Sequence, residues 1–204
     1  MTEREKMLKG ELYDPNDPEL LSLRKTAHNL CKDYNDTYED EEEKRAQILK
    51  KLLPQAGEGA YLQGPVYFDY GVFTKVGKNF YANFNFTVLD VCPVTIGDNV
   101  FIGPNVSLLT PRHPLRWQER NAYKTADGRT TDKEYGAPIN IGDNCWLAGD
   151  VKVCAGANIG EGCVIGAGSV VTGNISANSL AYGVPCRVVR TITEADRTDL
   201  KNRV

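Results

Sequence analysis

The sequence predicts a mainly β protein, a parallel β-helix of hexapeptide repeats that follows a helical segment and is interrupted by one long inserted loop. An aliphatic residue returns every six positions over much of the chain, whereas the first 56 residues show helical spacing. The six-residue register breaks once, between Leu108 and Ile141. These observations divide the chain into a helical segment (1–56), a β-helix domain (57–190) with an insertion at 109–138, and a C-terminal tail (191–204).

The helical segment carries a capping signal. Asp17, Pro18 and Glu19 supply an N-cap acceptor, a proline at the first helical position and an acid in the first turn. Apolar residues then recur at helical spacing and predict one buried face: Leu20, Leu21, Leu23, Ala27, Leu30 and Cys31. A second helix is expected over 40–53, because acids gather at its start and lysines at its end, before Pro54.

The repeat behind this segment has a period of six. One register of the C-terminal half is occupied by Ile141, Leu147, Val153, Ile159, Ile165, Val171 and Ala177. The same register runs earlier through Val76, Ala82, Val88, Ile96, Ile102 and Leu108, with two extra residues before Ile96. Small residues lie four positions after the first five members of the later set, at Cys145, Val151, Ala157, Cys163 and Ser169.

A period of six fits neither a helix, whose period is 3.6, nor one face of a flat strand, whose period is two. It fits brief strands joined by tight corners, in which inward aliphatic side chains form a ladder along the axis of stacked coils. The small residues suit the crowded corners, where a large side chain would collide. The sequence therefore predicts a solenoid of short strands.

The composition excludes several classes of function. The 204-residue chain has 25% charged residues and a net charge of −3, so it has no general electrostatic reason to bind nucleic acid or an anionic membrane. No apolar run approaches the roughly 18 residues that a membrane helix needs. The charged start of the chain does not resemble a secretory signal. We expect a cytoplasmic protein without nucleic-acid or membrane partners.

The cysteines do not predict a metal site or a disulfide framework. None of the six belongs to a C-x-x-C pair, and the chain has only two histidines. In a reducing compartment we expect small buried thiols at Cys31, Cys92, Cys145, Cys154, Cys163 and Cys186.

The insertion holds the strongest candidate for chemistry. A long polar loop that leaves a rigid solenoid is usually functional or disordered, and His113 stands at its root. Imidazole ionises near neutral pH, which suits a base that activates a weakly nucleophilic hydroxyl. On composition alone, a single loop histidine is more often incidental.

Five short motifs carry a family resemblance together with the hexapeptides: Gly10-Glu11-Leu12-Tyr13, Phe68-Asp69-Tyr70-Gly71, Asn79-Phe80-Tyr81-Ala82-Asn83, Thr110-Pro111-Arg112-His113-Pro114 and Gly183-Val184-Pro185-Cys186-Arg187. They resemble the maltose and galactoside O-acetyltransferases, which are hexapeptide-repeat acyltransferases. The resemblance covers nearly the whole chain. It implies a left-handed parallel β-helix, a homotrimer with active sites between subunits, and transfer of acetyl from acetyl-CoA to a sugar hydroxyl of the maltose, glucose or galactoside type.

The resemblance also implies roles for both histidines. His113 would be the general base of a direct transfer in a ternary complex, with hydrogen-bond donors that the sequence does not identify stabilising the oxyanion. His28 lies outside the motifs, and we expect it to be structural or on the surface. No metal is expected.

For the acceptor, the family's binding positions correspond to Asp69, Tyr81, Asn83 and Asp90. Polar groups of this kind suit a hydroxyl-rich ligand; the less favoured alternative for Asn83 and Asp90 is a turn residue at a coil corner. An acidic residue of the front segment is also implied, either Asp17, which competes with its N-cap role, or Asp14. One relative's acidic position falls on Val91, so some acceptor contacts are expected to differ.

For the coenzyme, the resemblance implies a site formed by Asn83, Trp146, Gly149, Ala167, Thr172, Gly173, Arg187 and Arg190. Small residues would leave backbone open to the pantetheine, and the arginines would bind phosphates. Some relatives carry lysine where this chain has Gly173, so one contact is expected to be missing. Surface charge would also explain the arginines, and Trp146 could simply cap the stack.

Two alternatives remain on the sequence, and a third is nearly excluded. The β-helix could be a non-catalytic binding scaffold, or the acceptor could be an amino acid or an antibiotic, since one imidazole serves any hydroxyl. A zinc-dependent carbonic anhydrase on the same helix needs three histidines, which this chain does not have.

Overall fold

The computed structural model describes residues 1–198, and the chain begins with three helices. In α1 (Glu3–Leu8), Thr2 and Glu5 form a reciprocal capping box. Helix α2 (Pro18–Asn35) begins where the sequence predicts, because the Asp17 carboxylate accepts from the backbone N–H groups of Glu19 and Leu20. The second expected helix, at 40–53, is α3 (Glu42–Leu52).

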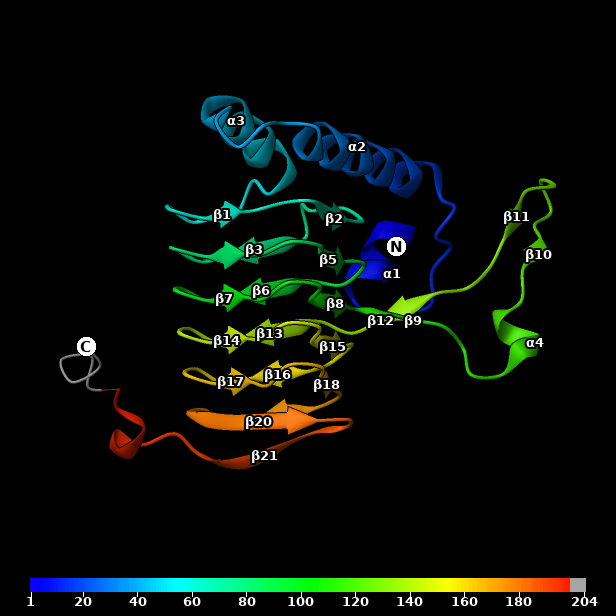
Figure 1. Ribbon diagram of the computed structural model, residues 1–204. Helices are drawn as coiled ribbons and strands as arrows, with labels where there is room; N and C mark the ends of the chain where they lie inside the picture. The colour runs from blue at the N-terminus through cyan, green and yellow to red at the C-terminus, as the bar shows by residue number, and fades with distance from the viewer. Residues whose placement is uncertain (199–204) are drawn as a thin grey trace.

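Behind the helices, short strands wind through three sheets whose coil-to-coil pairs are parallel (Figure 1). The β1 sheet contains β1 (Tyr61–Leu62), β4 (Tyr81–Ala82), β7 (Phe101–Ile102), β14 (Trp146–Leu147), β17 (Val164–Ile165), β20 (Ser179–Gly183) and β21 (Cys186–Thr191). The β2 sheet contains β2 (Val66–Phe68), β5 (Phe86–Leu89), β8 (Ser107–Leu109), β15 (Lys152–Cys154) and β18 (Val170–Val171). The β3 sheet contains β3 (Thr74–Val76), β6 (Val94–Ile96), β13 (Ile139–Ile141), β16 (Asn158–Ile159) and β19 (Asn174–Ile175).

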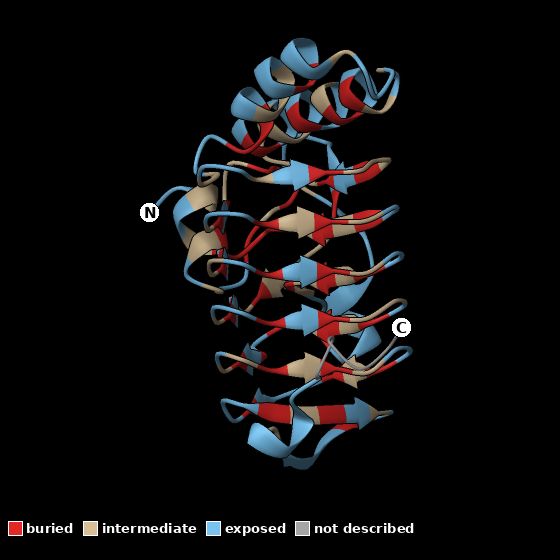
Figure 2. Ribbon diagram, turned by 60° about the vertical axis from the view of Figure 1, so that its left-hand side comes forward, coloured by how far each residue is buried: buried red, intermediate tan, exposed pale blue. Residues whose placement is uncertain are grey.

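The register confirms the six-residue repeat. Trp146 pairs with Val164, three hexapeptides later, so one coil takes three repeats. All the aliphatic residues predicted to point inward are buried except Ala177, which is exposed. The prediction is wrong there because the last coil is shorter: Ile175 takes the inward position, only four residues after Val171. Figure 2 shows buried residues recurring at matching places in successive coils.

The coil corners require unusual backbone conformations. Several corners place an asparagine in the left-handed region, as at Asn79, Asn99 and Asn144. Their side chains form a ladder between coils, since Asn79 donates to Asn99 at 3.0 Å and Asn99 donates to Asn144 at 3.3 Å. At Gly97, a Cβ would lie 2.6 Å from the Asp143 backbone nitrogen, so glycine is needed for adjacent coils to approach.

Both ends of the stack are covered. Helices α2 and α3 lie over the first coil (Figure 1), where the buried Arg45 guanidinium of α3 donates to the carbonyl oxygens of Leu62 and Gln63 at 2.8 and 3.0 Å. At the other end, β21 folds back antiparallel to β20. The expected tail at 191–204 contains the short helix η1 (Glu194–Asp196), and its residues 199–204 lie outside the described residues.

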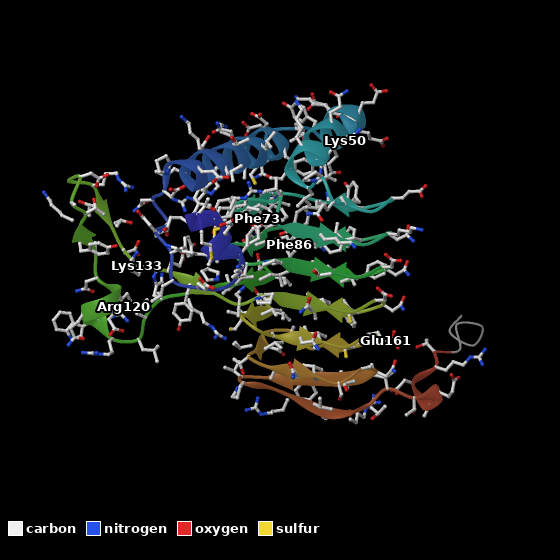
Figure 3. The ribbon with its side chains drawn as sticks, turned by 180° about the vertical axis from the view of Figure 1, so that it is seen from behind. Lys50, Phe73, Phe86, Arg120, Lys133 and Glu161 are labelled. Atoms are coloured by element: carbon white, nitrogen blue, oxygen red, sulfur yellow. The ribbon has the colours of Figure 1, made fainter. Side chains whose placement is uncertain are left out.

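The insertion leaves the stack after β8 and returns at β13. Its base is closed by antiparallel pairing of β9 (Pro111–Arg112) with β12 (Tyr135–Gly136). Beyond the base, it contains α4 (Trp117–Arg120) and a hairpin of β10 (Tyr123–Lys124) with β11 (Thr130–Thr131). Figure 3 shows its Arg120 and Lys133 outside the coil that carries Phe86. Among the helices of residues 1–198, none is both long and apolar enough to cross a membrane.

Candidate active site

One edge of the stack gathers residues that are far apart in the sequence. Phe68, Val88, Leu108, Val153 and Val171 are in register across the β2 sheet, so the corners that follow these strands stack along one line. We call this line the insertion edge, because the insertion leaves from it. It is formed by Asp69, Leu89, Leu109, Cys154 and Thr172.

His113 lies at the start of the insertion, with its side chain about half exposed. Its Nδ1 is 3.3 Å from the Lys133 carbonyl oxygen, and Asp132 Oδ2 is 3.7 Å from the same nitrogen. A carbonyl oxygen can only accept, so this contact assigns the proton to Nδ1 and leaves the Nε2 lone pair for chemistry. On that side, Nε2 is 3.7 Å from Glu134 Oε1. The imidazole therefore has a defined tautomer beside two carboxylates.

Glu134 is held by the N-terminal segment. The Tyr13 hydroxyl donates to Glu134 Oε2, and the two residues also pair through their backbones, with Tyr13 N–H 2.9 Å from the Glu134 carbonyl oxygen. Tyr13 is fully buried. Burial raises the pKa of Glu134, against the lowering effects of the Tyr13 hydrogen bond and of His113, while the Asp69 charge raises the pKa further.

Sequence reasoning missed both Tyr13 and Glu134 as site residues. Glu134 is one of many polar residues in the insertion, and its residue type does not distinguish it from the others. Tyr13 belongs to a motif that indicates the family but no role for the residue. The available signal was the Asp132-Lys133-Glu134 triplet just before the β-helix register resumes. Only the tertiary pairing of 13 with 134 shows that this triplet faces His113.

One face of α2 lies over the first coil at this edge. Arg24 and His28 are four residues apart, so they lie on the same side of the helix. His28 Nε2 is 3.6 Å from Asp69 Oδ1, and the His28 side chain is 56% exposed. Burial raises the pKa of Asp69, although the nearby Arg24 charge lowers it. His28 is therefore on the surface, as expected, but it borders the predicted acceptor residue Asp69.

The two acidic candidates of the front segment have different partners. The Asp17 carboxylate caps α2, which is the N-cap role that the sequence offered as the alternative to acceptor binding. Asp14 contacts the insertion: it accepts from the Thr131 hydroxyl, and its Oδ2 is 3.4 Å from Arg129. Asp14 thus ties the N-terminal segment to the loop that carries His113.

Asp90 is not open to an acceptor. It is fully buried, with Oδ1 accepting from the Tyr70 N–H at 2.8 Å and Oδ2 accepting from the Thr74 hydroxyl at 2.9 Å. Burial raises its pKa to about 6. This position contradicts the prediction that Asp90 binds the acceptor. Asp90 is instead a buried carboxyl group with a structural role.

Another set of predicted residues lies on a different edge. Tyr81, Phe101, Trp146 and Val164 are in register in the β1 sheet, so the corners that follow their strands stack into a second line. We call it the leading edge, because it precedes the β2-sheet strands. It carries Asn83, Gly149 and Ala167. The two edges lie at opposite ends of the β2-sheet strands, so one chain does not bring Asn83 and His113 together.

The Maltose acetyltransferase hexapeptide capping motif matches residues 6–57, and the Bacterial transferase hexapeptide (six repeats) matches 138–173. The galactoside O-acetyltransferase of Escherichia coli is 41% identical over 197 residues, covering 97% of this chain and 92% of that protein. A maltose O-acetyltransferase structure from Clostridium difficile 630 superposes with a TM-score of 0.88 at 45% identity, covering 95% of this chain and 99% of that one.

The chain belongs to the maltose and galactoside O-acetyltransferase family. Membership makes it an enzyme of the acetyltransferase class, and its fold is the left-handed parallel β-helix of hexapeptide-repeat acyltransferases. A structure of galactoside acetyltransferase in complex with coenzyme A superposes with a TM-score of 0.87 at 40% identity, covering 96% of this chain and 94% of that one.

The coenzyme residues expected for this family are distributed over both edges. Thr172, Gly173 and Arg187 line a hollow of about 500 Å³ near the last coil. A Cβ at Gly173 would meet nothing within 4 Å, so the backbone there is open to a ligand. Arg190 is paired with Asp196 at 2.6 Å. Trp146, at 50% exposed, lies on the face of the β1 sheet, and the half-buried Gly149 and exposed Ala167 lie in corners of the leading edge.

The chain shows no metal centre in its described part. Across residues 1–198, no cluster of three or more His, Cys, Asp or Glu side chains is arranged to hold an ion. The cysteines within this range form no disulfide, and all are buried except Cys154, which is half-buried.

Proposed function

We propose that this family member is an acetyl-CoA-dependent O-acetyltransferase that modifies a hydroxyl of a sugar of the maltose, glucose or galactoside type. The observation that carries the proposal is the placement of His113. Its Nδ1 faces a carbonyl oxygen, its Nε2 is available, and it stands on the same edge as Asp69. The named activities of the relatives support the acceptor class.

The transfer is direct, within a complex of enzyme, donor and acceptor. Acetyl-CoA supplies the thioester carbonyl that the acceptor oxygen attacks. His113 Nε2 removes the acceptor's hydroxyl proton as the oxygen attacks, and the same nitrogen returns a proton to the leaving thiolate. The carboxylate of Glu134 stabilises the protonated imidazole electrostatically, and the Tyr13 hydroxyl fixes the position of that carboxylate.

Binding of the sugar requires groups that accept from hydroxyls. Asp69 supplies a carboxylate at the insertion edge. Tyr81 and Asn83 supply polar groups at the leading edge, and Asn83 also serves the coenzyme side. Asp17 is occupied by the α2 cap, so the acidic contribution of the front segment is assigned to Asp14, which contacts the insertion.

Coenzyme A is bound along the lower coils. Thr172, Gly173 and Arg187 form its hollow near the last coil, and Trp146, Gly149 and Ala167 provide an aromatic face and open backbone. Arg187 and Arg190 bind phosphate groups, for which Arg190 exchanges its Asp196 partner.

The active enzyme is a homotrimer with its sites between subunits. The insertion edge of one copy and the leading edge of another must meet to place His113 beside Asn83 and Gly149. The outer face of the β1 sheet supports this arrangement, because it exposes a row of aromatic side chains that a second copy would cover: Tyr61 at 42%, Phe101 at 55% and Trp146 at 50%.

An acceptor panel tests the proposal. The enzyme is incubated with acetyl-CoA, a thiol reagent and either maltose, glucose, a thiogalactoside, an amino acid or an aminoglycoside. We expect the highest kcat/KM with a sugar, and His113→Ala lowers kcat by about 10²–10⁴-fold. A higher kcat/KM for a non-sugar contradicts the acceptor class. A His113→Ala variant that keeps more than about a tenth of the rate contradicts the role of the base.

A further inference from the structure

A pocket of about 400 Å³ lies beside the candidate active site, between α2 and the β2 sheet. From α2 it is lined by His28, Cys31 and Lys32, and from the β2 sheet and its corner by Tyr67, Asp69 and Leu89. Its volume is in the range of small-molecule sites, which is about 300–1,000 Å³. None of the catalytic steps above uses it apart from its shared residue, Asp69.

The free hydrogen-bonding groups of this pocket are at one end. His28 Nε2 and Asp69 Oδ1 are 3.6 Å apart, longer than a good hydrogen bond, so both retain capacity for a ligand hydroxyl. Two other polar side chains of the lining already have protein partners. Lys32 pairs with Asp36 at 2.5 Å, and the Asn35 side chain donates to and accepts from the Val66 backbone at 2.9 and 2.8 Å.

The rest of the lining is apolar or aromatic. Cys31 and Leu89 contribute sulfur and aliphatic surface, and Tyr67 is 50% exposed at the pocket. A pyranose ring has hydroxyls around its rim and a C–H face, which matches a polar end beside an aromatic wall. A polyanion or a wholly apolar ligand would leave one of these two parts unmatched.

The pocket meets the insertion edge at Asp69. Asp69 is both the end of the pocket and a member of the insertion edge. From there, its charge reaches Glu134, which is 3.7 Å from the base. A ligand bound in the pocket at Asp69 would thus have its free end directed along the insertion edge, the edge from which the segment of His113 leaves.

We propose that this pocket binds the second pyranose ring of a disaccharide acceptor, the ring that is not acetylated. The inference rests on the proposed sugar acetyltransferase function and gives it a preference for acceptors longer than one ring. His28 and Asp69 bind hydroxyls of the second ring, and Tyr67 packs against its C–H face. His28 is then a specificity-determining residue rather than a catalytic one.

Steady-state kinetics with acceptors of two lengths test the proposal. Wild type, His28→Ala and Tyr67→Ala are assayed with acetyl-CoA and either glucose or maltose. Each variant is expected to raise KM for maltose at least about fivefold more than KM for glucose, which is the scale of one hydrogen bond or ring contact. An isopropyl thiogalactoside arm distinguishes a second sugar ring from an alkyl aglycone.

Two substitutions outside the pocket serve as matched controls. Asn29→Ala changes the exposed neighbour of His28 on α2, and Tyr38→Ala removes a tyrosine that is 78% exposed away from the pocket. Neither should separate the two acceptors. Equal effects of His28→Ala on both acceptors, or a larger effect on the alkyl glycoside than on maltose, overturn the second-ring assignment. If the wild type acetylates maltose no better than a control without enzyme but does acetylate glucose or the thiogalactoside, the second-ring assignment fails alone; if it acetylates none of the three, the proposed function itself fails.

Discussion

At the residue scale, His113 depends on neighbours from three distant parts of the chain. His113 lies near the start of the insertion, Glu134 lies near its end, and Tyr13 comes from the N-terminal segment. The sequence could identify His113, because it is one of two histidines and stands where the repeat breaks. It could not identify the Tyr13–Glu134 pair, since a contact between residues 121 positions apart leaves no local pattern.

Replacing Glu134 by Gln should lower kcat by roughly 10- to 100-fold with little change in KM, because a neutral amide no longer stabilises the protonated imidazole. Tyr13→Phe should lower kcat by about tenfold, since it keeps the ring but releases the carboxylate. Steady-state kinetics measure both. Tyr123→Phe on the insertion hairpin is the matched control, and wild-type kcat in both test variants would disprove this role.

Asp90 is expected to make stability depend on pH. Its pKa is about 6 in the folded chain against an ordinary value of 3.8. A carboxyl group whose pKa is raised by folding contributes stability at low pH, and this contribution is lost as the pH rises through the folded value. Urea unfolding should therefore show the wild type losing stability relative to Asp90→Asn between pH 4 and pH 7, on the order of 3 kcal/mol. A difference in unfolding free energy between the two proteins that does not change with pH would contradict the raised pKa of Asp90.

At the element scale, the hexapeptide period determined most of the fold, because each inward aliphatic side chain repeats one local environment. It failed at Ala177, where the last coil shortens and Ile175 replaces the expected residue. The corners were also less predictable than the strands. Asparagines at positive φ form inter-coil ladders, and a search for aliphatic residues alone does not detect them.

Two glycine substitutions should separate corners that need glycine from corners that do not. Gly97→Ala should destabilise the protein by about 1–3 kcal/mol, because its Cβ would lie 2.6 Å from the Asp143 nitrogen. Gly173→Ala meets open space at an ordinary φ, so it should be neutral or stabilising by up to about 1 kcal/mol. Thermal or urea unfolding compares the two, and equal effects would contradict the packing argument.

At the scale of the whole molecule, the predicted site residues fall on two edges rather than in one cleft. The sequence identified these residues by motif. A motif does not indicate whether two of its residues meet within one chain or between two chains. Along one chain, Asp69 and Thr172 share the insertion edge, from which the segment of His113 leaves, while Asn83, Gly149 and Ala167 share the leading edge. In the proposed trimer, the insertion edge of one copy would meet the leading edge of another and complete the site.

Mixed trimers test this division. His113→Ala and Asn83→Ala chains are each expected to be nearly inactive as pure trimers. After unfolding and refolding together in equal amounts, about a quarter of the sites should combine an intact His113 with an intact Asn83 from a neighbour. Activity of the mixture reports this recovery, with separately refolded and then mixed trimers as the control. No recovery would contradict a site shared between subunits.

The N-terminal segment is strapped to the insertion at several points, since Tyr13 pairs with Glu134, Asp14 bonds Thr131, and Asn16 donates to Thr131 at 3.2 Å. The first residues of the chain therefore hold the insertion that carries His113, although they lie outside the β-helix itself. Shortening the chain ahead of α2 would free the insertion and would also uncover the small core that Met7 and Tyr13 form with Tyr70 and Val91, so slower turnover should come together with a lower melting temperature.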